Sequence, residues 1–346
     1  MLSFAGIDVS KDRLDVMVLP EEQRSSVSND PTSWAELVEQ LRALSIAAIG
    51  IEASGGYERG IMRALLSAGM PVRHVNPFKL RQFAKASGVL AKNDPLYARM
   101  IASFVAIMPT RPAQSRPPAV ERLVEVLAVR RQLSAEKVAA ENASRLLENA
   151  MLQRLSRRRI ARLAADIEML DERLVEIVAA DAALAHRYRM LTSMPGVGPV
   201  LACTLIALLP ELGRMSRKQV AALVGVAPYA FESGKLKGKR CVWGGRAPVR
   251  TVWSMGTLVA TRCHPQINAL YHRLLAAGKS KKVALTACRH KLVTMFNAML
   301  QYRIPWQPQE THNEKNRQGP LDNQDSCSAR ASLPLPAAGE RQRYVS

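Results

Sequence analysis

The chain has 346 residues, enough for about two domains, each with its own hydrophobic core. Its 49 lysines and arginines against 29 acids give a net charge of +20, which favours a nucleic acid as partner over a solvated basic surface with no partner. No apolar run approaches a membrane span, and the five cysteines form no close pair. We therefore expect reduced thiols in a cytoplasmic, nucleoid-associated protein that makes no membrane contact.

Short strand-like and helix-like segments alternate in the first part of the chain, residues 1–108. The β-patterned runs, of which the first two form a hairpin, are 4–9, 13–19, 46–52 and 71–75. Helical patterns cover 31–44, 56–69, 77–87 and 95–107. This order predicts an α/β domain with a mixed sheet, helices on its faces and the chemistry at the strand ends.

Residues 119–194 contain neither glycine nor proline, and apolar residues recur there at helical spacing. We expect a helical arm over 119–188 that folds back near Ser156 to Arg159 into an antiparallel pair. Such an arm dimerises or bridges domains, and an ordinary helical bundle is the alternative. Arg157, Arg158 and Arg159 at the expected bend are candidates for contacts with nucleic acid.

A third region, residues 190–303, is predicted to be mainly α-helical. It opens with Met194-Pro195-Gly196-Val197-Gly198-Pro199, which resembles a helix-hairpin-helix turn. The glycines of such a turn let backbone amides approach a phosphate, so Gly196 and Gly198 are candidate phosphate contacts, although a plain turn between helices needs similar residues. Residues 304–346 lack periodicity and are rich in proline and polar residues, so we expect a disordered tail.

Three acids of the first hundred residues stand where an apolar run ends or a helix begins. Asp8 and Glu52 each end an apolar run, so their carboxylates are expected where a buried strand meets solvent. Asp94 precedes Pro95, an arrangement that also serves simply to cap a helix. Carboxylate oxygens suit Mg²⁺, and bound metal ions assist displacement at a phosphodiester. The three acids therefore predict a magnesium site for chemistry on nucleic acid.

Tyr97 stands three residues after Asp94, on the same face of the expected helix. A fourth carboxylate there would complete a divalent-metal site. A phenol cannot replace it, because with a pKa of about 10 it is neutral near pH 7.

A glycine- and lysine-rich hairpin is predicted over residues 228–246. Within it, Ser233 precedes Gly234 and is followed by a run of cations, so Ser233 is either a nucleophile toward phosphorus or simply a turn serine. The candidate nucleic-acid contacts of this segment and the helix after it are Lys235, Lys237, Lys239, Arg240, Arg246 and Arg250.

Five sequence blocks, taken in order, resemble the DEDD transposases of insertion-sequence family one-hundred-and-ten. They are Gly6 to Lys11, Ile51 to Tyr57, Leu90 to Asp94, Met194 to Pro199 and Ser233 to Lys235, with further similarity at 243–246 and 274–288. The resemblance extends over about residues 3–303. It implies a RuvC-like, ribonuclease-H-like N-terminal domain, a coiled-coil arm and a C-terminal transposase domain with a catalytic serine.

On the family pattern, Asp8, Glu52 and Asp94 fall on three of four acids that bind Mg²⁺, and Ser233 on the nucleophile that bonds covalently to DNA. The family motif Lys-Thr-Asp-x-x-Asp-Ala reads Lys92-Asn93-Asp94-Pro95-Leu96-Tyr97-Ala98 here, without the last acid. The resemblance also implies DNA partners, both element ends and target, a structured bridge RNA as guide, and a homo-oligomer between dimer and tetramer.

Two rival functions remain open at this point. One is a RuvC-like junction nuclease, in which water attacks in place of Ser233. The other is a catalytically weakened or inactive copy that only binds nucleic acid, which the loss of the acid at Tyr97 favours.

Overall fold

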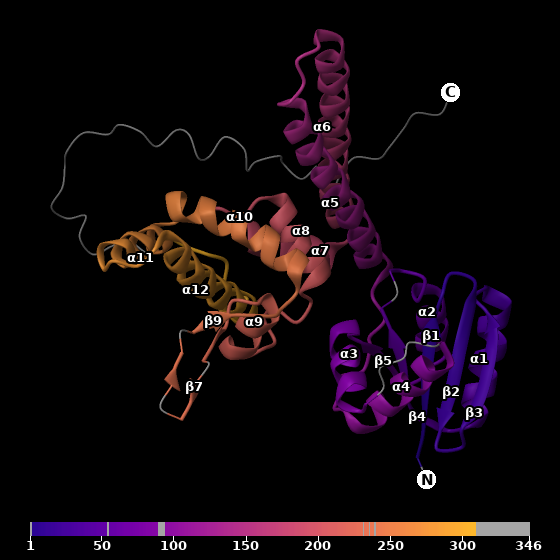
Figure 1. Ribbon diagram of the computed structural model, residues 1–346. Helices are drawn as coiled ribbons and strands as arrows, with labels where there is room; N and C mark the ends of the chain where they lie inside the picture. Colours follow the sequence, from indigo (N-terminus) through magenta and orange to yellow (C-terminus); the bar gives the residue numbers. More distant parts are fainter. Residues whose placement is uncertain are drawn as a thin grey trace, which may run out of the picture. The chain divides into compact units, whose positions relative to one another are not determined.

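The computed structural model describes residues 2–53, 55–88, 94–230, 232–234, 236–238 and 240–308 (Figure 1). The chain divides into two compact units, Met1–Arg116 and Pro117–Ser346. Of the expected tail, residues 309–346 lie outside the described part.

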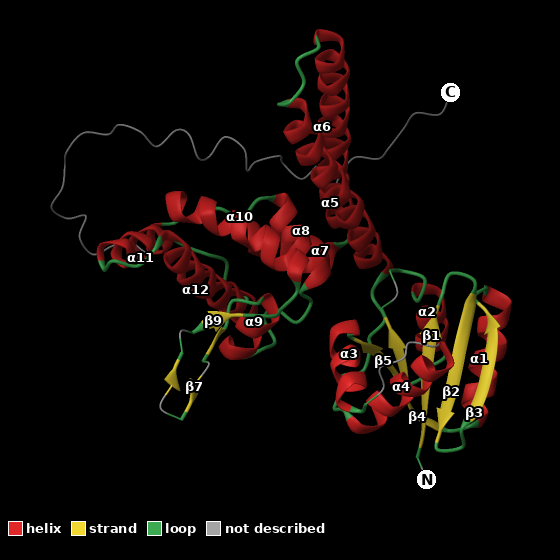
Figure 2. Cartoon of the chain, in the orientation of Figure 1, coloured by secondary structure: helices red, strands yellow, loops and turns green. Residues whose placement is uncertain are grey.

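The first unit is built on a five-stranded sheet in the order β3-β2-β1-β4-β5 (Figure 2). The strands are β1 Ser3–Val9, β2 Arg13–Leu19, β3 Gln23–Ser28, β4 Ile46–Glu52 and β5 Val72–Val75. The first three are antiparallel, while β4 and β5 run parallel to β1. This is a ribonuclease-H-like arrangement, and it confirms the mixed sheet predicted from the sequence.

Helices cover both faces of this sheet. On one face α1 Pro31–Ala43 and α2 Arg59–Ser67 pack on strand residues that include Ile7, Val16 and Ile51. On the other face lie α3 Pro77–Ala86 and α4 Asp94–Ile107, with Ala48 and Val75 of the sheet beneath them. The alternation of side chains along each strand therefore divides the domain into two cores.

Two glycines bring α4 unusually close to the sheet. A Cβ atom on Gly6 of β1 would lie 2.1 Å from the carbonyl oxygen of Ala98 and 2.4 Å from the amide nitrogen of Ala102. One on Gly50 of β4 would lie 2.6 Å from Ile101 Cγ2. The backbone of α4 therefore rests directly on β1 at Gly6, and its Ile101 and Val105 side chains rest on β4 at Gly50.

The second unit begins with a long helical hairpin, α5 Pro118–Ser144 and α6 Ala150–Ala179. An ion pair between Arg130 and Asp171 joins the two antiparallel helices. The predicted fold-back near residues 156–159 is wrong, because α6 runs through it without interruption. The chain turns at residues 145–149 instead, where Asn149 caps α6 by accepting hydrogen bonds from the amides of Met151 and Leu152.

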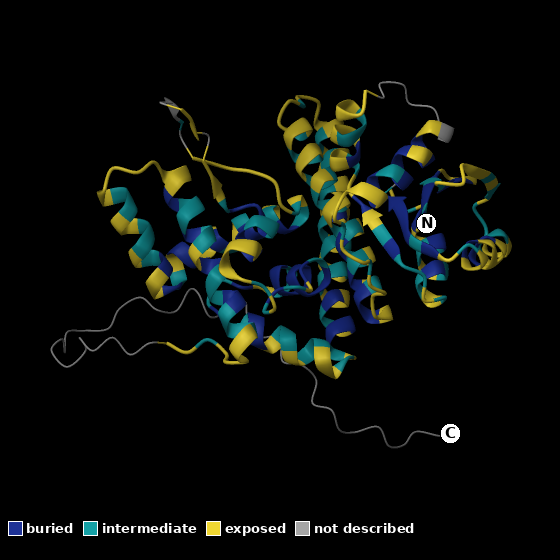
Figure 3. Ribbon diagram, turned by 90° about the horizontal axis from the view of Figure 1, so that it is seen from below, coloured by how far each residue is buried: buried dark blue, intermediate teal, exposed yellow. Residues whose placement is uncertain are grey.

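The rest of the unit consists of α7 Ala182–Thr192, α8 Pro199–Leu208, α9 Arg217–Val224, α10 Ala247–Cys263, α11 Pro265–Ala276 and α12 Lys281–Tyr302. Helix α8 lies at its centre, with residues 201–207 all buried (Figure 3). Leu123 of α5 and Leu174 of α6 share this core. The base of the hairpin therefore packs within the C-terminal unit, and the boundary expected at 188–190 falls inside α7.

Between α9 and α10 the chain forms two small antiparallel ribbons. They pair β6 Pro228–Tyr229 with β9 Cys241–Val242, and β7 Glu232–Ser233 with β8 Leu236–Lys237. In the described part of the chain, no helix combines the length and the apolar character that a membrane span requires.

We predict that Gly6→Ala destabilises the first unit by about 1–3 kcal/mol, because the added methyl group must displace the backbone of α4. Gly198→Ala is the matched control, since its φ of −89° is ordinary and a Cβ there meets nothing within 4 Å. Urea denaturation followed by circular dichroism measures both. Equal stability of the two variants would contradict the close packing of α4.

Candidate active site

The carboxylates of Asp8 and Glu52 emerge side by side at the ends of two central strands. Strands β1 and β4 are parallel and pair Gly6 with Gly50 and Ile7 with Ile51, so Asp8 and Glu52 occupy the next position on each. Alternation along the strands places both on the face covered by α4. Glu52 is 9% exposed and Asp8 is half-buried. The structure thus brings together two of the three acids predicted from the sequence.

Tyr97 occupies the space over Glu52. Its phenol donates a hydrogen bond to Glu52 Oε1 over 3.2 Å, and the side chain is 8% exposed. Burial first, and then the charge and hydrogen bond of Glu52, raise the pKa of Tyr97 to about 12, while the guanidinium of Arg81 acts in the opposite direction. The phenol is therefore a neutral donor at pH 7 that engages one carboxylate oxygen.

Asp94 is the first residue of α4, one turn before Tyr97 on the same helix. The placement of its side chain lies outside the described residues. Because α4 crosses β1 and β4 in direct contact, its first turn starts beside the strand ends that carry Asp8 and Glu52.

A fourth acid was not foreseen from the sequence. Asp15 of β2 pairs directly with Asp8 across the antiparallel ladder, so its side chain shares the face covered by α4. It is 7% exposed, and its Oδ2 accepts a hydrogen bond of 3.0 Å from Arg13 Nε. The signal was the alternation Arg13-Leu14-Asp15-Val16, which puts Arg13 and Asp15 on the polar side of β2. Arg13 supplies a positive charge at the edge of the acidic group.

The donor set suits a hard divalent cation but is incomplete within the described residues. Asp8 and Glu52 supply carboxylate oxygens of the kind that Mg²⁺ prefers. No group of three or more acids, histidines or cysteines in the described part of the chain is arranged to hold a metal ion. A metal ion bound here would therefore need the carboxylate of Asp94 as well. The ion would also compete with the phenol of Tyr97 for the carboxylate of Glu52.

Ser233 lies at the end of β7, opposite Leu236 of β8, and is exposed. Gly234 follows it with a φ of +54°, a conformation that glycine adopts easily in a two-residue hairpin turn. Lys235 and Lys239, and the side chain of Lys237, lie outside the described residues, whereas Arg240 is exposed. The serine thus belongs to the second unit and the carboxylates to the first.

The two glycines of the turn before α8 differ in what they do. Gly196 has a φ of +90°, and a Cβ there would lie 2.9 Å from the amide nitrogen of Ala260, so it permits α10 to pack on the turn. Gly198 caps α8 and faces open space. Only Gly198 has the accessibility expected of a phosphate contact.

The predicted basic contacts also divide into two groups. Arg157, Arg158 and Arg159 are exposed along α6. Arg246 is instead held by Glu211, with Nη1 and Nη2 donating hydrogen bonds of 2.7 and 2.6 Å, and Nη1 also donates to the Leu208 carbonyl. This bidentate pair, together with the bond to Leu208, ties the start of α10 to the end of α8 and the loop after it, so Arg246 has a structural role, and its contact with nucleic acid stays a prediction. Arg250 donates to the Gly244 carbonyl.

Comparison with known proteins adds two family matches. A family model described as a transposase, of the DEDD type, matches residues 5–159. A second, described as the transposase IS116/IS110/IS902 family, matches residues 188–272.

Two curated proteins are similar over different lengths. The pilin gene-inverting protein of Moraxella bovis is 25% identical over 318 residues, covering 88% of this chain and 97% of that protein. An uncharacterized 42 kDa protein of insertion element IS900 from Mycobacterium paratuberculosis is 29% identical over 171 residues, covering 46% of this chain and 41% of that protein. Among solved structures, Thermus thermophilus RuvC with a Holliday junction substrate is 17% identical, with a TM-score of 0.26, covering 33% of this chain and 100% of RuvC.

The raised pKa of Tyr97 predicts a specific pH dependence of stability. Because the folded pKa of about 12 exceeds the unfolded value of about 10, the stabilisation is complete below pH 10 and is lost as the pH rises toward 12. The difference in free energy of unfolding between wild type and Tyr97→Phe should therefore be constant from pH 7 to about 9.5 and shrink above it. A difference that stays constant up to pH 11.5 would contradict the raised pKa, and with it the burial of Tyr97 beside Glu52.

Proposed function

This chain belongs to the IS116/IS110/IS902 family of DEDD transposases and acts on DNA in recombination, and we propose that it does so by transesterification through Ser233 assisted by Mg²⁺. The observation that carries the proposal is the pair Asp8 and Glu52, set on adjacent strand ends beneath the helix that begins at Asp94. A basic protein that buries acids together at one point has a site suited to a cation and a phosphodiester.

In this proposal Asp8, Glu52 and Asp94 hold the Mg²⁺. When bound, the ion supplies charge neutralisation at the scissile phosphate and promotes ionisation of the attacking hydroxyl. Asp15 keeps Arg13 beside the acids, where its guanidinium meets the substrate's phosphate. Tyr97 donates to Glu52 and thereby lowers the negative charge available from that carboxylate.

Ser233 supports a covalent route because it is exposed beside a tight turn, in a stretch whose sequence is rich in lysine and arginine. Its Oγ forms a bond to phosphorus as the bond from phosphorus to the departing deoxyribose oxygen breaks. Attack by a hydroxyl at another DNA end then forms the new phosphodiester and releases the serine. Two exchanges of one ester for another conserve the bond energy, so the cut strands are rejoined without an external energy source.

The curated relatives support rejoining over cleavage alone. The Moraxella proteins are named for inverting a pilin gene, and inversion of a DNA segment requires that cut strands be joined again. A junction nuclease that uses water as nucleophile would leave the ends open. This favours the recombinase over the first rival function.

The proposal includes RNA and further copies of the chain as partners. We propose that a structured bridge RNA selects the DNA by base pairing, while the exposed Arg157 to Arg159 and Arg240, together with the lysines that neighbour Ser233 in the sequence, hold backbones without reading bases. A dimer or tetramer is supported by apolar side chains exposed near the far end of the helical hairpin: Leu146 is 85%, Met151 56% and Leu155 52% exposed.

A covalent protein–DNA adduct tests the route through Ser233. Wild type incubated with Mg²⁺ and DNA that carries the element ends should yield an adduct that survives denaturing electrophoresis, and Ser233→Ala should yield none. Ser280→Ala is the matched control, because Ser280 is also exposed and makes no capping hydrogen bond. An adduct that persists in Ser233→Ala would rule out this serine as nucleophile.

Tyr97→Asp tests whether the acidic site is weakened at position 97. The new carboxylate crowds Glu52, so we expect the variant to be less stable than wild type without metal, to regain stability with Mg²⁺, and to bind Mg²⁺ about tenfold more tightly. Thermal denaturation and calorimetric titration measure these effects, and recombination should rise in parallel. Tyr97→Phe, which adds no ligand, is the control.

The same variant decides the second rival function. If Tyr97→Asp gains affinity for Mg²⁺ and recombination appears only then, the natural chain is a weakened copy. If wild type already recombines DNA and the variant gains nothing, three acids are sufficient. Unchanged Mg²⁺ affinity would show that position 97 does not face the metal.

A further inference from the structure

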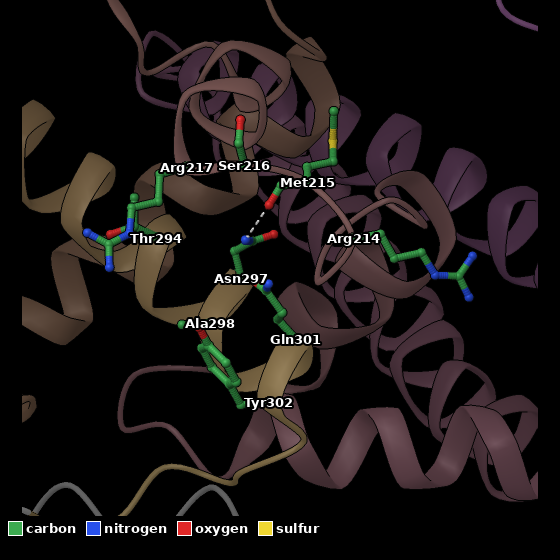
Figure 4. A pocket seen from close by; sticks show the side chains of 9 residues that line it. All are labelled: Arg214, Met215, Ser216, Arg217, Thr294, Asn297, Ala298, Gln301 and Tyr302. Carbon is green, nitrogen blue, oxygen red and sulfur yellow. Dashed lines mark hydrogen bonds between the residues drawn. The ribbon is translucent and has the colours of Figure 1, made fainter.

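The second unit contains a polar pocket whose lining residues do not include Ser233. It has a volume of about 370 Å³ and lies between the loop that leads into α9 and the last turns of α12. The loop and the start of α9 contribute Arg214, Ser216 and Arg217, and α12 contributes Thr294, Gln301 and Tyr302. Figure 4 shows Arg217 and Arg214 at opposite ends of this group, with the Arg214 side chain directed outward and Tyr302 at the lower edge. Its size fits a single nucleotide-sized group.

The loop that forms one side of this pocket is held firmly in place. Asn297 of α12 is 3% exposed; its Oδ1 accepts a hydrogen bond of 2.9 Å from the Gly213 amide, and its Nδ2 donates one of 2.8 Å to the Met215 carbonyl. Gly213 has a φ of +90°, and a Cβ there would lie 2.7 Å from Leu300 Cβ. The arginines on either side of Met215 therefore project from a fixed backbone, which reduces the entropy lost when a ligand binds.

Within the described residues, no acidic side chain pairs with the arginines of the pocket. No acid lines the pocket, and within the described residues neither Arg214 nor Arg217 forms an ion pair. The nearby Glu211 is already engaged by Arg246. Burial, and next the charge of Arg214, lower the pKa of Arg187, while the charge of Glu211 raises it.

The aromatic ring of Tyr302 favours single-stranded nucleic acid over other anions as the ligand of this pocket. Its ring is 69% exposed although it stands at the edge of a formed pocket. An exposed aromatic ring beside cations is the combination with which proteins hold single-stranded nucleic acid, because bases stack on the ring while cations contact the backbone. A duplex offers no free base face to the ring.

We propose that this pocket binds a single-stranded segment of nucleic acid, with backbone phosphates at Arg214 and Arg217 and a base stacked on Tyr302. The site uses neither the carboxylates nor Ser233. Binding at this pocket can therefore be tested separately from transesterification.

Fluorescence anisotropy with the full-length chain tests the proposal. The probes are labelled single-stranded DNA, RNA of the same sequence and duplex DNA, titrated in chelator at several salt concentrations so that no strand is cut. Arg214→Gln with Arg217→Gln should lower the magnitude of the salt slope for a single strand by about 1.4, since each phosphate contact contributes about 0.7. The control, Arg262→Gln with Arg273→Gln, removes equal charge from exposed positions on α10 and α11.

Tyr302→Leu separates stacking from charge. It should weaken single-strand binding about tenfold with the salt slope unchanged, leave duplex binding unchanged, and Tyr302→Phe should retain wild-type affinity. The stronger of the DNA and RNA effects identifies the natural strand. Circular dichroism and thermal denaturation verify that each variant is folded.

Two outcomes would overturn the proposal. One is that the arginine pair behaves like its control, and the pocket then does not contact phosphate. The other is that the arginine pair lowers the salt slope, but Tyr302→Leu weakens the binding of single strands and of duplex equally, or weakens neither. The surface then holds the backbone of a duplex, and no base stacks on Tyr302.

Discussion

The direct contact of α4 with the central strands is the constraint on which the candidate active site depends. Gly6 and Gly50 lack the side chains that would hold the helix away, so the backbone of α4 lies against β1 and its Ile101 and Val105 side chains lie against β4. That contact fixes where the first turn of the helix starts and brings Tyr97 within hydrogen-bond distance of Glu52. A larger residue at either glycine would move the whole constellation and not only one side chain.

The acids gathered by this contact are compensated in different ways. Asp15 is paired with Arg13, and Glu52 accepts a hydrogen bond from a neutral phenol. A buried carboxylate without such a partner would lower the free energy of unfolding. That a basic chain nevertheless gathers acids at this point is consistent with a binding role for them. The phenol is a mild partner, because it satisfies one oxygen of Glu52 without adding a charge or a metal ligand.

The sequence was sufficient where apolar runs are short and clearly bounded. Strands β1, β2 and β4, and the acids at the ends of β1 and β4, follow from such runs. Strand β3 was missed because its residues are almost all polar; it is held by pairing with β2, and only Val27 packs on the core. The bend of the helical hairpin was misplaced by about ten residues, since arginine-rich residues 157–159 suit a helix as well as a turn and the capping signal is the single Asn149.

Other parts of the site depend on tertiary contacts that no local pattern contains. Asp15 joins Asp8 only through the register of β1 and β2. Arg246 resembles any other cation of a basic segment until Glu211, 35 residues earlier, is seen to engage it. Arg214 and Arg217 differ from Arg246 in that no acid engages them in the described part of the chain. This follows from the pocket that α12 and the loop before α9 form, whose lining contains no acid.

The stereochemical course at phosphorus tests the covalent route most directly. A DNA substrate with a chiral phosphorothioate at the cut site would be recombined and the configuration of the product phosphorus determined. Each in-line displacement inverts phosphorus, so attack by Ser233 followed by attack of a DNA hydroxyl predicts overall retention. Inversion would mean a single displacement by water or by a DNA hydroxyl, and would contradict the serine mechanism.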